Sequence, residues 1–315
     1  MGKNILGKNI IAAIYMVIGL ALLMGTAGAV NKTNADWYLH LDIKAIEQGS
    51  LKDLIDHKTE DNDIDKVLVM AFGEHLKEEL EKITVYGAHT GFNDFTLMMQ
   101  GDFSDKARKD FQQKMADGKN HATEKVSGNI LHSWVFDGYH SDDGELDIDV
   151  DDDDKPLQLY AAQLGRKAIV VSRDKNEVKA WMKGQYGLNE LNHEGVFEVV
   201  VNLQNALAHG GFNFGKEKID LGFDSSVMQK VSQFSFSVAQ TEKTTDIEVG
   251  LVTKDKQIAI QLKNIVNGLI ALQAIAGDMD EDIQAFTKNL SIEAQGVNVI
   301  LKSSIETSEI KKLTE

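Results

Sequence analysis

Hydrophobic and polar residues alternate in two similar stretches of the chain, residues 82–115 and 233–266. Each stretch has two segments of period-two alternation, a polar turn between them and an amphipathic segment after them, which predicts a hairpin followed by a helix. The first strands lie 151 residues apart and the second strands 152, so the second turn is one residue longer. The alternation predicts that two sets of apolar residues each face a core: Ile83, Val85, Leu97 and Met99 in the first hairpin, and Phe234, Phe236, Val249 and Leu251 in the second.

Further strands and helices are predicted from the strand alternation of two residues and the helical spacing of three and four residues. Spacings of three and four residues favour a helix from Asp65 to Ile83 and another over 105–116, whose Ala107, Phe111 and Met115 lie on one face. Asp174 and Glu177 have the spacing of a capping box that opens a helix. Shorter patterns predict strands at 37–43, 128–136, 157–164, 167–172, 197–203 and 297–302, and helices at 46–55, 224–231, 279–290 and 306–313.

Hairpins alternating with helices are typical of the α+β class rather than of a parallel doubly wound sheet. We predict two related repeats, each an antiparallel sheet with helices packed on one face. Residues 30–190 form the first repeat, which contains the acidic loop 142–154, and residues 191–315 form the second.

The first 29 residues have the pattern of a secretory signal peptide. Lys3 and Lys8 precede an apolar run, and Ala27-Gly28-Ala29 offers the small residues that signal peptidase accepts. We expect cleavage after Ala29 and a periplasmic or extracellular protein with no membrane span after cleavage. The competing interpretation is an uncleaved anchor, because the apolar run just reaches the ~20 residues that span a bilayer.

The charge balance narrows the class of partner. The 315 residues carry 33 basic and 49 acidic side chains, a formal net charge of −16, and they contain no cysteine. Such a surface repels phosphate backbones, so the composition argues against nucleic acid. The absence of cysteine excludes thiol chemistry and Cys-ligated metal.

The second post-hairpin helix, predicted over 257–276, is the most apolar segment after the signal peptide. It is apolar over most of its circumference, which indicates cover on several sides. One interpretation is a central helix between a sheet and a neighbouring helix. The other is a partner or ligand surface, including a homodimer interface, formed by Leu262, Ile265, Val266, Leu269 and Ile270.

Residues 142–154 hold nine carboxylates in thirteen positions. Asp147, Asp149, Asp151 and Asp153 could supply oxygens for a weak calcium site. An EF-hand is excluded, since Asp152 occupies the position of the required glycine and Gln158 that of the closing glutamate. We expect a solvated loop in which Leu146–Val150 at most pairs along a sheet edge.

Catalytic signals are weak. The nine histidines include His121, His132 and His140 near the acidic stretch, but no HxH, HxxH or HExxH spacing fixes two ligands on one face, so surface histidines without metal are expected. There is no G-x-S-x-G motif. We therefore expect no enzyme and no cofactor beyond weakly held calcium.

The sequence predicts an exported, non-enzymatic binding or structural protein of the cell envelope. A cleft between the repeats or the helix 257–276 would accept a small apolar ligand or a protein partner. The alternatives are a calcium-responsive structural or adhesion protein that uses the acidic loops, and a hydrolase whose site is not visible in sequence.

Overall fold

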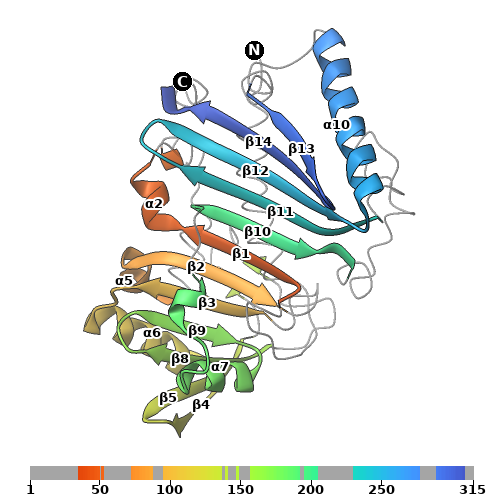
Figure 1. The fold of residues 1–315 in the computed structure, drawn as a ribbon. Coiled ribbons are helices and arrows are strands. Elements are labelled where there is room, and N and C mark those ends of the chain that lie inside the picture. The colour runs from red at the N-terminus through yellow and green to blue at the C-terminus, as the bar shows by residue number, and fades with distance from the viewer. Residues whose placement is uncertain are drawn as a thin grey trace. The chain divides into compact units, whose positions relative to one another are not determined.

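The computed structural model describes residues 35–49, 51–52, 72–87, 95–136, 139–140, 147–148, 157–191, 195–204, 230–276 and 289–308. The predicted signal peptide lies outside these ranges. The described residues fall into two compact units (Figure 1). Residues 35–44 and 72–191 belong to one, here called the N-unit, and residues 45–52 and 195–308 belong to the other, the C-unit. The boundary predicted near residue 190 stays a prediction.

The described part of the N-unit contains an antiparallel sheet in the order β1-β2-β3-β9-β8-β5-β4. Its strands are β1 (Trp37–Asp42), β2 (Leu80–Gly87), β3 (Thr96–Gly101), β4 (Lys119–Val126), β5 (Asn129–Phe136), β8 (Leu157–Leu164) and β9 (Ala168–Ser172). Its helices are α5 (Glu74–Glu78), α6 (Asp105–Asp117) and α7 (Lys175–Met182), followed by the 3-10 turn η3 (Leu188–Leu191).

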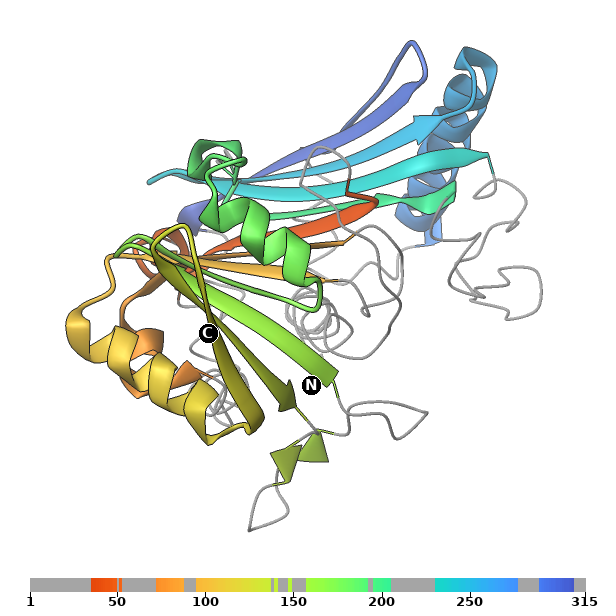
Figure 2. The ribbon, with the colours of Figure 1, turned by 90° about the horizontal axis from the view of Figure 1, so that it is seen from below.

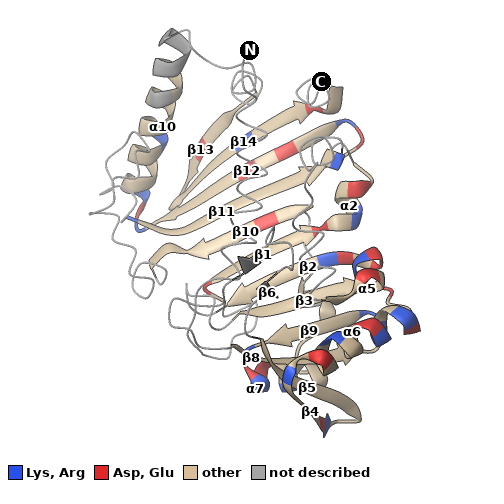
Figure 3. Ribbon diagram, turned by 180° about the vertical axis from the view of Figure 1, so that it is seen from behind, with Lys and Arg blue, Asp and Glu red and all other residues tan. Residues whose placement is uncertain are grey.

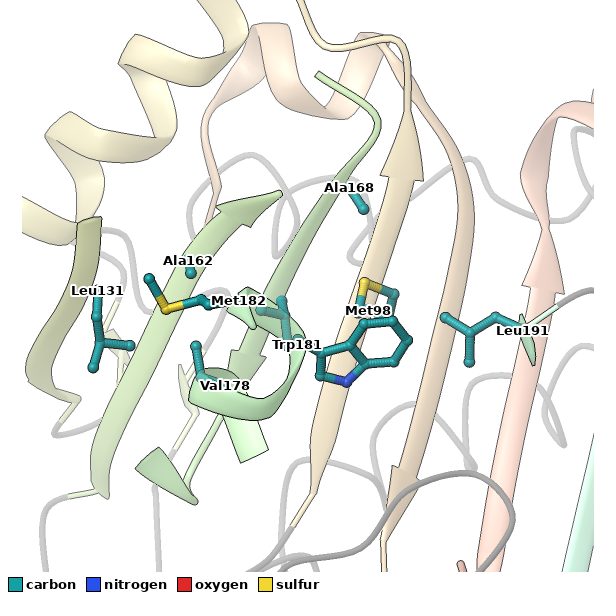
Figure 4. Packing of buried hydrophobic residues seen from close by; sticks show 9 residues of the cluster. Met98, Leu131, Ala162, Ala168, Val178, Trp181, Met182 and Leu191 are labelled. Atoms are coloured by element: carbon teal, nitrogen blue, oxygen red, sulfur yellow. The ribbon is translucent and has the colours of Figure 1, made fainter. Parts of the chain in front are cut away.

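Helices cover both faces of this sheet (Figure 2). Neighbouring residues of a strand point to opposite faces. Ala162 of β8 packs in the cluster that α7 covers (Figure 4). The next residue, Gln163, donates through Nε2 to the Arg108 carbonyl of α6 at 2.9 Å. The prediction of helices on one face only is therefore wrong for the N-unit, and this double cover explains why all five residues of β9 are buried.

Helix α6 confirms its predicted face. Ser104 caps its first turn, since Oγ accepts from Ala107 N at 3.2 Å. Ala107, Phe111 and Met115, spaced four residues apart, are all buried. The apolar face that the sequence pattern predicted for α6 is therefore the face that is buried.

The C-unit has an antiparallel sheet in the order β13-β14-β12-β11-β10 within its described residues. Its strands are β10 (Phe197–Asn202), β11 (Val231–Gln240), β12 (Thr244–Thr253), β13 (Ser291–Gln295) and β14 (Asn298–Glu306). Helix α10 (Lys256–Ala276) follows β12. Helix α2 (Ile43–Glu47) begins in the N-unit and continues into the C-unit, where Gln240 Nε2 donates to the Ala45 carbonyl.

The two faces of the C-unit sheet differ in polarity. One row of cross-strand neighbours is apolar and consists of Val199, Phe236, Val249 and Leu301. The adjacent row, which points to the opposite face, is polar and consists of Glu198, Ser237, Glu248 and Lys302. The first of these faces is therefore the more apolar, and α10 packs on it.

Each predicted apolar set shares one face of its hairpin, as expected. Ile83 pairs with Met99 and Val85 with Leu97. In the C-unit, Phe234 pairs with Leu251, and the pair of Phe236 and Val249 lies beside them. Met99 is buried and the other members are half-buried. Both units contain a strand, a hairpin, a helix and a second hairpin in the same order. In the part of the chain described here, only the N-unit has a further strand pair, β8 and β9, which lies between β3 and β5 in its sheet. A relationship between two repeats stays a prediction.

Several boundaries differ from the sequence prediction. Leu80 was expected in a helix, and Ile83 both at the end of that helix and in the following strand; both lie in β2, which pairs with strands on both sides. Hydrogen bonding to two neighbours outweighs the helical spacing that these residues share with Leu76. Strands β4 and β13 were not predicted, because their exposed, polar positions give little hydrophobic alternation. Val231 starts β11 where a helix was expected to end; residues 224–229 and 279–288 lie outside the described ranges.

Candidate functional site

Helix α10 begins at a well-defined cap. Asp255 Oδ1 accepts from the backbone N–H groups of Gln257 at 2.8 Å and Ile258 at 3.0 Å. These bonds satisfy two of the amides that have no partner within the helix. Thr253 Oγ1 lies 2.8 Å from the carbonyls of both Asp255 and Val297, so it ties the start of the helix to the turn before β14.

Only one side of α10 is anchored by the described residues. Ala259 and Leu262 are buried against Val231 of β11 and Val299 of β14. Half-buried side chains complete this contact, namely Leu203, Leu251, Ile292, Ala294 and Leu301. The anchoring residues lie in the first two turns of the helix, next to β12, β13 and β14 (Figure 1).

The outward side of α10 carries exposed apolar residues. Ile260 is 43% exposed and Ile265 is 37% exposed, which makes them two of the few large exposed hydrophobic residues among those described. Of the predicted surface residues, Leu262 is instead an anchor, Val266 and Ile270 are half-buried, and the side chain of Leu269 lies outside the described set. The neighbouring helix that the central-helix interpretation requires, predicted over 279–290, lies outside the described residues except for 289–290, so that interpretation stays a prediction.

The charge of α10 contrasts with that of the whole chain. Lys256 and Lys263 are its charged residues, and it contains no aspartate or glutamate (Figure 3). No basic residue lies in its last turn. Residues 264–276 contain no charged residue.

Gly268 is an unusual residue for the interior of this helix. Glycine in a helix interior costs about 1 kcal/mol relative to alanine. A Cβ at this position would meet nothing within 4 Å, so no described neighbour in the monomer requires the glycine. Ala271 and Asn264, which share its side of the helix, are also exposed.

A buried polar network in the N-unit is a second candidate. Tyr86 Oη donates to Glu177 Oε1 at 2.7 Å and accepts from Trp181 Nε1 at 2.8 Å. Tyr186 Oη donates to Glu177 Oε2 at 3.3 Å. Burial raises the pKa of the Glu177 carboxyl, although the tyrosine hydrogen bonds oppose the shift. Burial, followed by the charge of Glu177, raises the pKa of Tyr86. These groups satisfy one another inside the core, which indicates a structural role.

The same network corrects the predicted capping box. Asp174 does cap α7, since Oδ1 accepts from Asn176 N at 2.8 Å. Glu177 turns inward to the tyrosines, and Ser172 Oγ instead accepts from Asp174 N at 3.0 Å. A serine at the end of β9 therefore performs the reciprocal half of the box.

Replacing Glu177 with glutamine should change the pH dependence of stability. Because the folded pKa is raised, the folded state binds more protons than the unfolded state between about 4.5 and that raised pKa. The stabilisation from Glu177 is full below about 4.5 and is lost as pH rises through the folded pKa. Urea unfolding followed by tryptophan fluorescence reports the N-unit, because all three tryptophans, Trp37, Trp134 and Trp181, lie there. The stability of the wild type relative to Glu177→Gln should fall across this range. A difference that is constant or rises with pH would contradict the assignment.

The acidic stretch is described in only one short segment. Asp147 lies in β7 (Asp147–Ile148), which pairs with β6 (Tyr139–His140) in a two-stranded sheet of its own. The expectation of pairing along the edge of a larger sheet is therefore wrong. The other predicted calcium ligands, Asp149, Asp151 and Asp153, lie outside the described residues, so the calcium site stays a prediction. No group of three or more His, Cys, Asp or Glu within the described ranges could hold a metal ion.

The structure brings two of the three predicted histidines together. His121 Nε2 lies 3.1 Å from His132 Nδ1, whereas His140 lies in β6. Sequence spacing missed this pair because its members lie eleven residues apart on two strands. The turn at Ser127-Gly128, where both φ angles are positive, is the local signal that could have aligned them.

Comparisons with known proteins add little. No protein-family model and no curated protein matches the chain. Among solved structures, three crystal forms of TP0453 are similar over nearly the whole length of both chains. Form I has 11% identity, covers 94% of this chain and 95% of that one, and has a TM-score of 0.42. Form III has 10% identity, 93% and 96% coverage and a TM-score of 0.41. Form IV has 10% identity, 94% and 96% coverage and a TM-score of 0.43. These values carry no conclusion about function. Among the described helices, none combines the length and apolar character needed to cross a bilayer.

Proposed function

We propose that the chain is an exported, non-enzymatic protein of the bacterial cell envelope that acts by self-association, with α10 as the contact between two copies. The observation that carries the proposal is the exposed side of α10, where Ile260 and Ile265 are uncovered and Gly268 leaves open space. The N-terminal sequence pattern supports export.

A macromolecular partner suits this surface better than a small apolar ligand. Small-molecule sites are concave and enclose most of their ligand. The exposed side of α10 is the convex surface of a helix anchored through Ala259 and Leu262 on its opposite side. Helices with one free apolar side are typically recognised by packing against another protein surface.

Charge favours a second copy in antiparallel orientation. Two chains of net charge −16 repel each other over most of their surfaces, so a contact needs a segment without carboxylates, and α10 is such a segment. Antiparallel pairing keeps Lys256 and Lys263 of the two helices at opposite ends of the contact. It also brings the positive end of each helix dipole toward the negative end of the other. A twofold contact of this kind is self-complementary.

Gly268 is the position at which the α10 helices of the two copies would cross. Small residues allow two helix backbones to approach closely, and the helix has no other described reason for a glycine there. The exposed neighbours Asn264 and Ala271 flank this point, and Ile265 borders it. We place the crossing of the two helices at Gly268.

Replacing Gly268 with leucine should abolish the dimer without harming the monomer. The added side chain enters open space in the monomer, and leucine is the better helix former. In the dimer it would separate the two backbones. Sedimentation velocity over a range of concentrations should show a dimer for the wild type and a monomer for Gly268→Leu. The matched control is Ala116→Leu, which adds the same side chain at an exposed position of α6 and should leave the dimer intact.

Two results would overturn the proposal. One is a wild-type chain that stays monomeric at every concentration, whether or not the purified protein carries a bound lipid. The other is a Gly268→Leu variant that dimerises as well as the wild type.

A further inference from the structure

The described part of the N-unit contains a direct hydrogen bond between two imidazole rings, and no role so far explains it. His121 Nε2 of β4 lies 3.1 Å from His132 Nδ1 of β5. The ring centroids are 5.4 Å apart and the ring planes are inclined by 24°, so the two rings meet end to end. One of the facing nitrogens therefore donates a proton and the other accepts it. His132 is 7% exposed and His121 is half-buried, which places this bond within the surface of the sheet.

The pair holds a part of the hairpin that has few other contacts. Among the described strands, β4 pairs with β5 alone, and most of its residues are exposed. The register between the two strands is interrupted between Lys119 and Ala122, so His121 lies inside the irregular stretch. Asn120 beside it has a φ of 54°, a left-handed conformation that is costly for a residue other than glycine. Releasing residues 119–121 from β5 would therefore break few contacts and relieve this conformation.

Protonation changes how the two rings can interact. In the neutral pair each ring carries one proton, and one ring donates to the other. A first additional proton on His121 keeps the bond, because the imidazolium N–H donates to the unprotonated Nδ1 of His132. A second additional proton, on His132, leaves a proton on all four ring nitrogens. Two donors and two positive charges then face each other at 3.1 Å, which opposes the closed arrangement.

The strands next to His132 lack a carboxylate that could balance a second positive charge. Its cross-strand neighbours are Thr123 of β4 and Ala161 of β8, and neither side chain titrates. Strands β5 and β8 contain no lysine, arginine, aspartate or glutamate. Glu124, the carboxylate of β4, points to the opposite face, where it pairs with two lysines of α7.

Helix α6 packs on the face of the sheet to which His132 points. The charged residues in its last turn, before β4, are Lys114 and Asp117. Asp117 already accepts a hydrogen bond from a glutamine of its own helix at 2.8 Å. The other charges of β4, Lys119 and Lys125, are positive and would oppose a further proton on the pair.

We propose that the hydrogen-bonded pair of His121 and His132 is a pH-sensitive switch. It holds the start of β4 on β5 while it carries at most one additional proton, and it releases this segment when it carries two. Release uncovers the edge of β5, whose N–H and C=O groups then face solvent. The switch lies within the N-unit and does not depend on contact through α10.

The direction of the pH dependence follows from His132. Burial, followed by the charge of His121, lowers the pKa of His132 below its ordinary value of 6.5. The closed arrangement therefore binds fewer protons than the released one between the lowered pKa and 6.5. Its stability is full above 6.5 and is lost as the pH falls through the lowered pKa of His132.

Hydrogen exchange resolved by nuclear magnetic resonance tests the switch in the full chain. The protection factors of residues 121–126, corrected for the intrinsic effect of pH, should fall about tenfold between about pH 7 and about pH 5. Amides of β9, in the middle of the sheet, should keep their protection. The ring-nitrogen signals of His132 should report its protonation with the same midpoint, below 6.5.

His121→Gln separates the switch from an ordinary buried histidine. The glutamine amide keeps a hydrogen-bonding group on β4 but carries no charge, and its oxygen can accept from protonated His132. The loss of protection at low pH should therefore disappear in this variant. His140→Gln, the same substitution in β6, should retain it.

Far-ultraviolet circular dichroism checks that both variants are folded, and the wild-type titration tests the switch without them. The proposal is overturned if the protection of β4 in the wild type does not change with pH or if His132 titrates at or above 6.5. It is also overturned if folded His121→Gln opens at low pH as the wild type does.

Discussion

Replacing Tyr86 with phenylalanine should lower the free energy of unfolding of the N-unit by about 2–5 kcal/mol, since two buried polar groups lose their partner at once. The Tyr86 hydroxyl is at the centre of the network, because it donates to Glu177 and accepts from Trp181. Without it, the buried carboxyl of Glu177 loses its shorter hydrogen bond and the buried indole N–H of Trp181 loses its acceptor at 2.8 Å. Each such loss costs about 1–3 kcal/mol, and more where the group is charged.

Tyr186→Phe is the matched control for this change. Its hydroxyl makes a longer bond, 3.3 Å, to the other oxygen of Glu177, and the residue is half-buried. We expect a loss of about 0.5–1.5 kcal/mol, the usual net value of one hydrogen bond. Urea unfolding followed by tryptophan fluorescence measures both variants. Equal losses for the two tyrosines, or a Tyr86→Phe variant as stable as the wild type, would show that the network does not stabilise the core.

Leu262→Ala should destabilise the C-unit by about 2–5 kcal/mol, the range for truncation of a buried leucine. Leu262 is 4% exposed and packs with Ala259 between α10 and the sheet. Ile265→Ala, one turn further along the helix, should change the stability of the monomer by less than about 0.5 kcal/mol, because its side chain is substantially exposed.

Hydrogen exchange read by mass spectrometry measures this contrast in the C-unit, which contains no tryptophan. In Leu262→Ala, the amides of β12 and β14 should exchange faster than in the wild type. In Ile265→Ala, they should exchange at the wild-type rate. Both variants are measured under monomeric conditions. Equal effects at the two positions would show that α10 packs by a different side from the one described.

The sequence predicted the elements in which packing and periodicity agree. Helix α6 is an example, since its cap at Ser104 and its buried residues four positions apart follow from local rules. The hairpins around Ile83 and Phe234 were predicted with the correct shared faces, because period-two alternation fixes which residues lie together.

The features that were predicted wrongly or missed depend on contacts between residues distant in sequence. The end of the helix predicted up to Ile83 was overridden by pairing of β2 with both β1 and β3. The inward turn of Glu177 depends on Tyr86, which lies 91 residues away. The contact between His121 and His132 depends on a shift in register that no hydrophobic pattern encodes. For α10 the apolar stripe was evident, but which of its residues are anchors and which are exposed follows from the position of β14.

The most direct test of self-association uses the absence of cysteine in the chain. Gly268→Cys introduces a single thiol at the proposed crossing point, and the matched variant Ala116→Cys introduces one at an exposed position of α6. A disulfide requires Cα atoms about 4.4–6.8 Å apart, so rapid linking under mild oxidation reports close approach of the two helices. We predict that Gly268→Cys forms a covalent dimer quickly and that Ala116→Cys does so slowly or not at all. A Gly268→Cys protein that stays unlinked, or two variants that link at the same rate, would contradict α10 as the contact between copies.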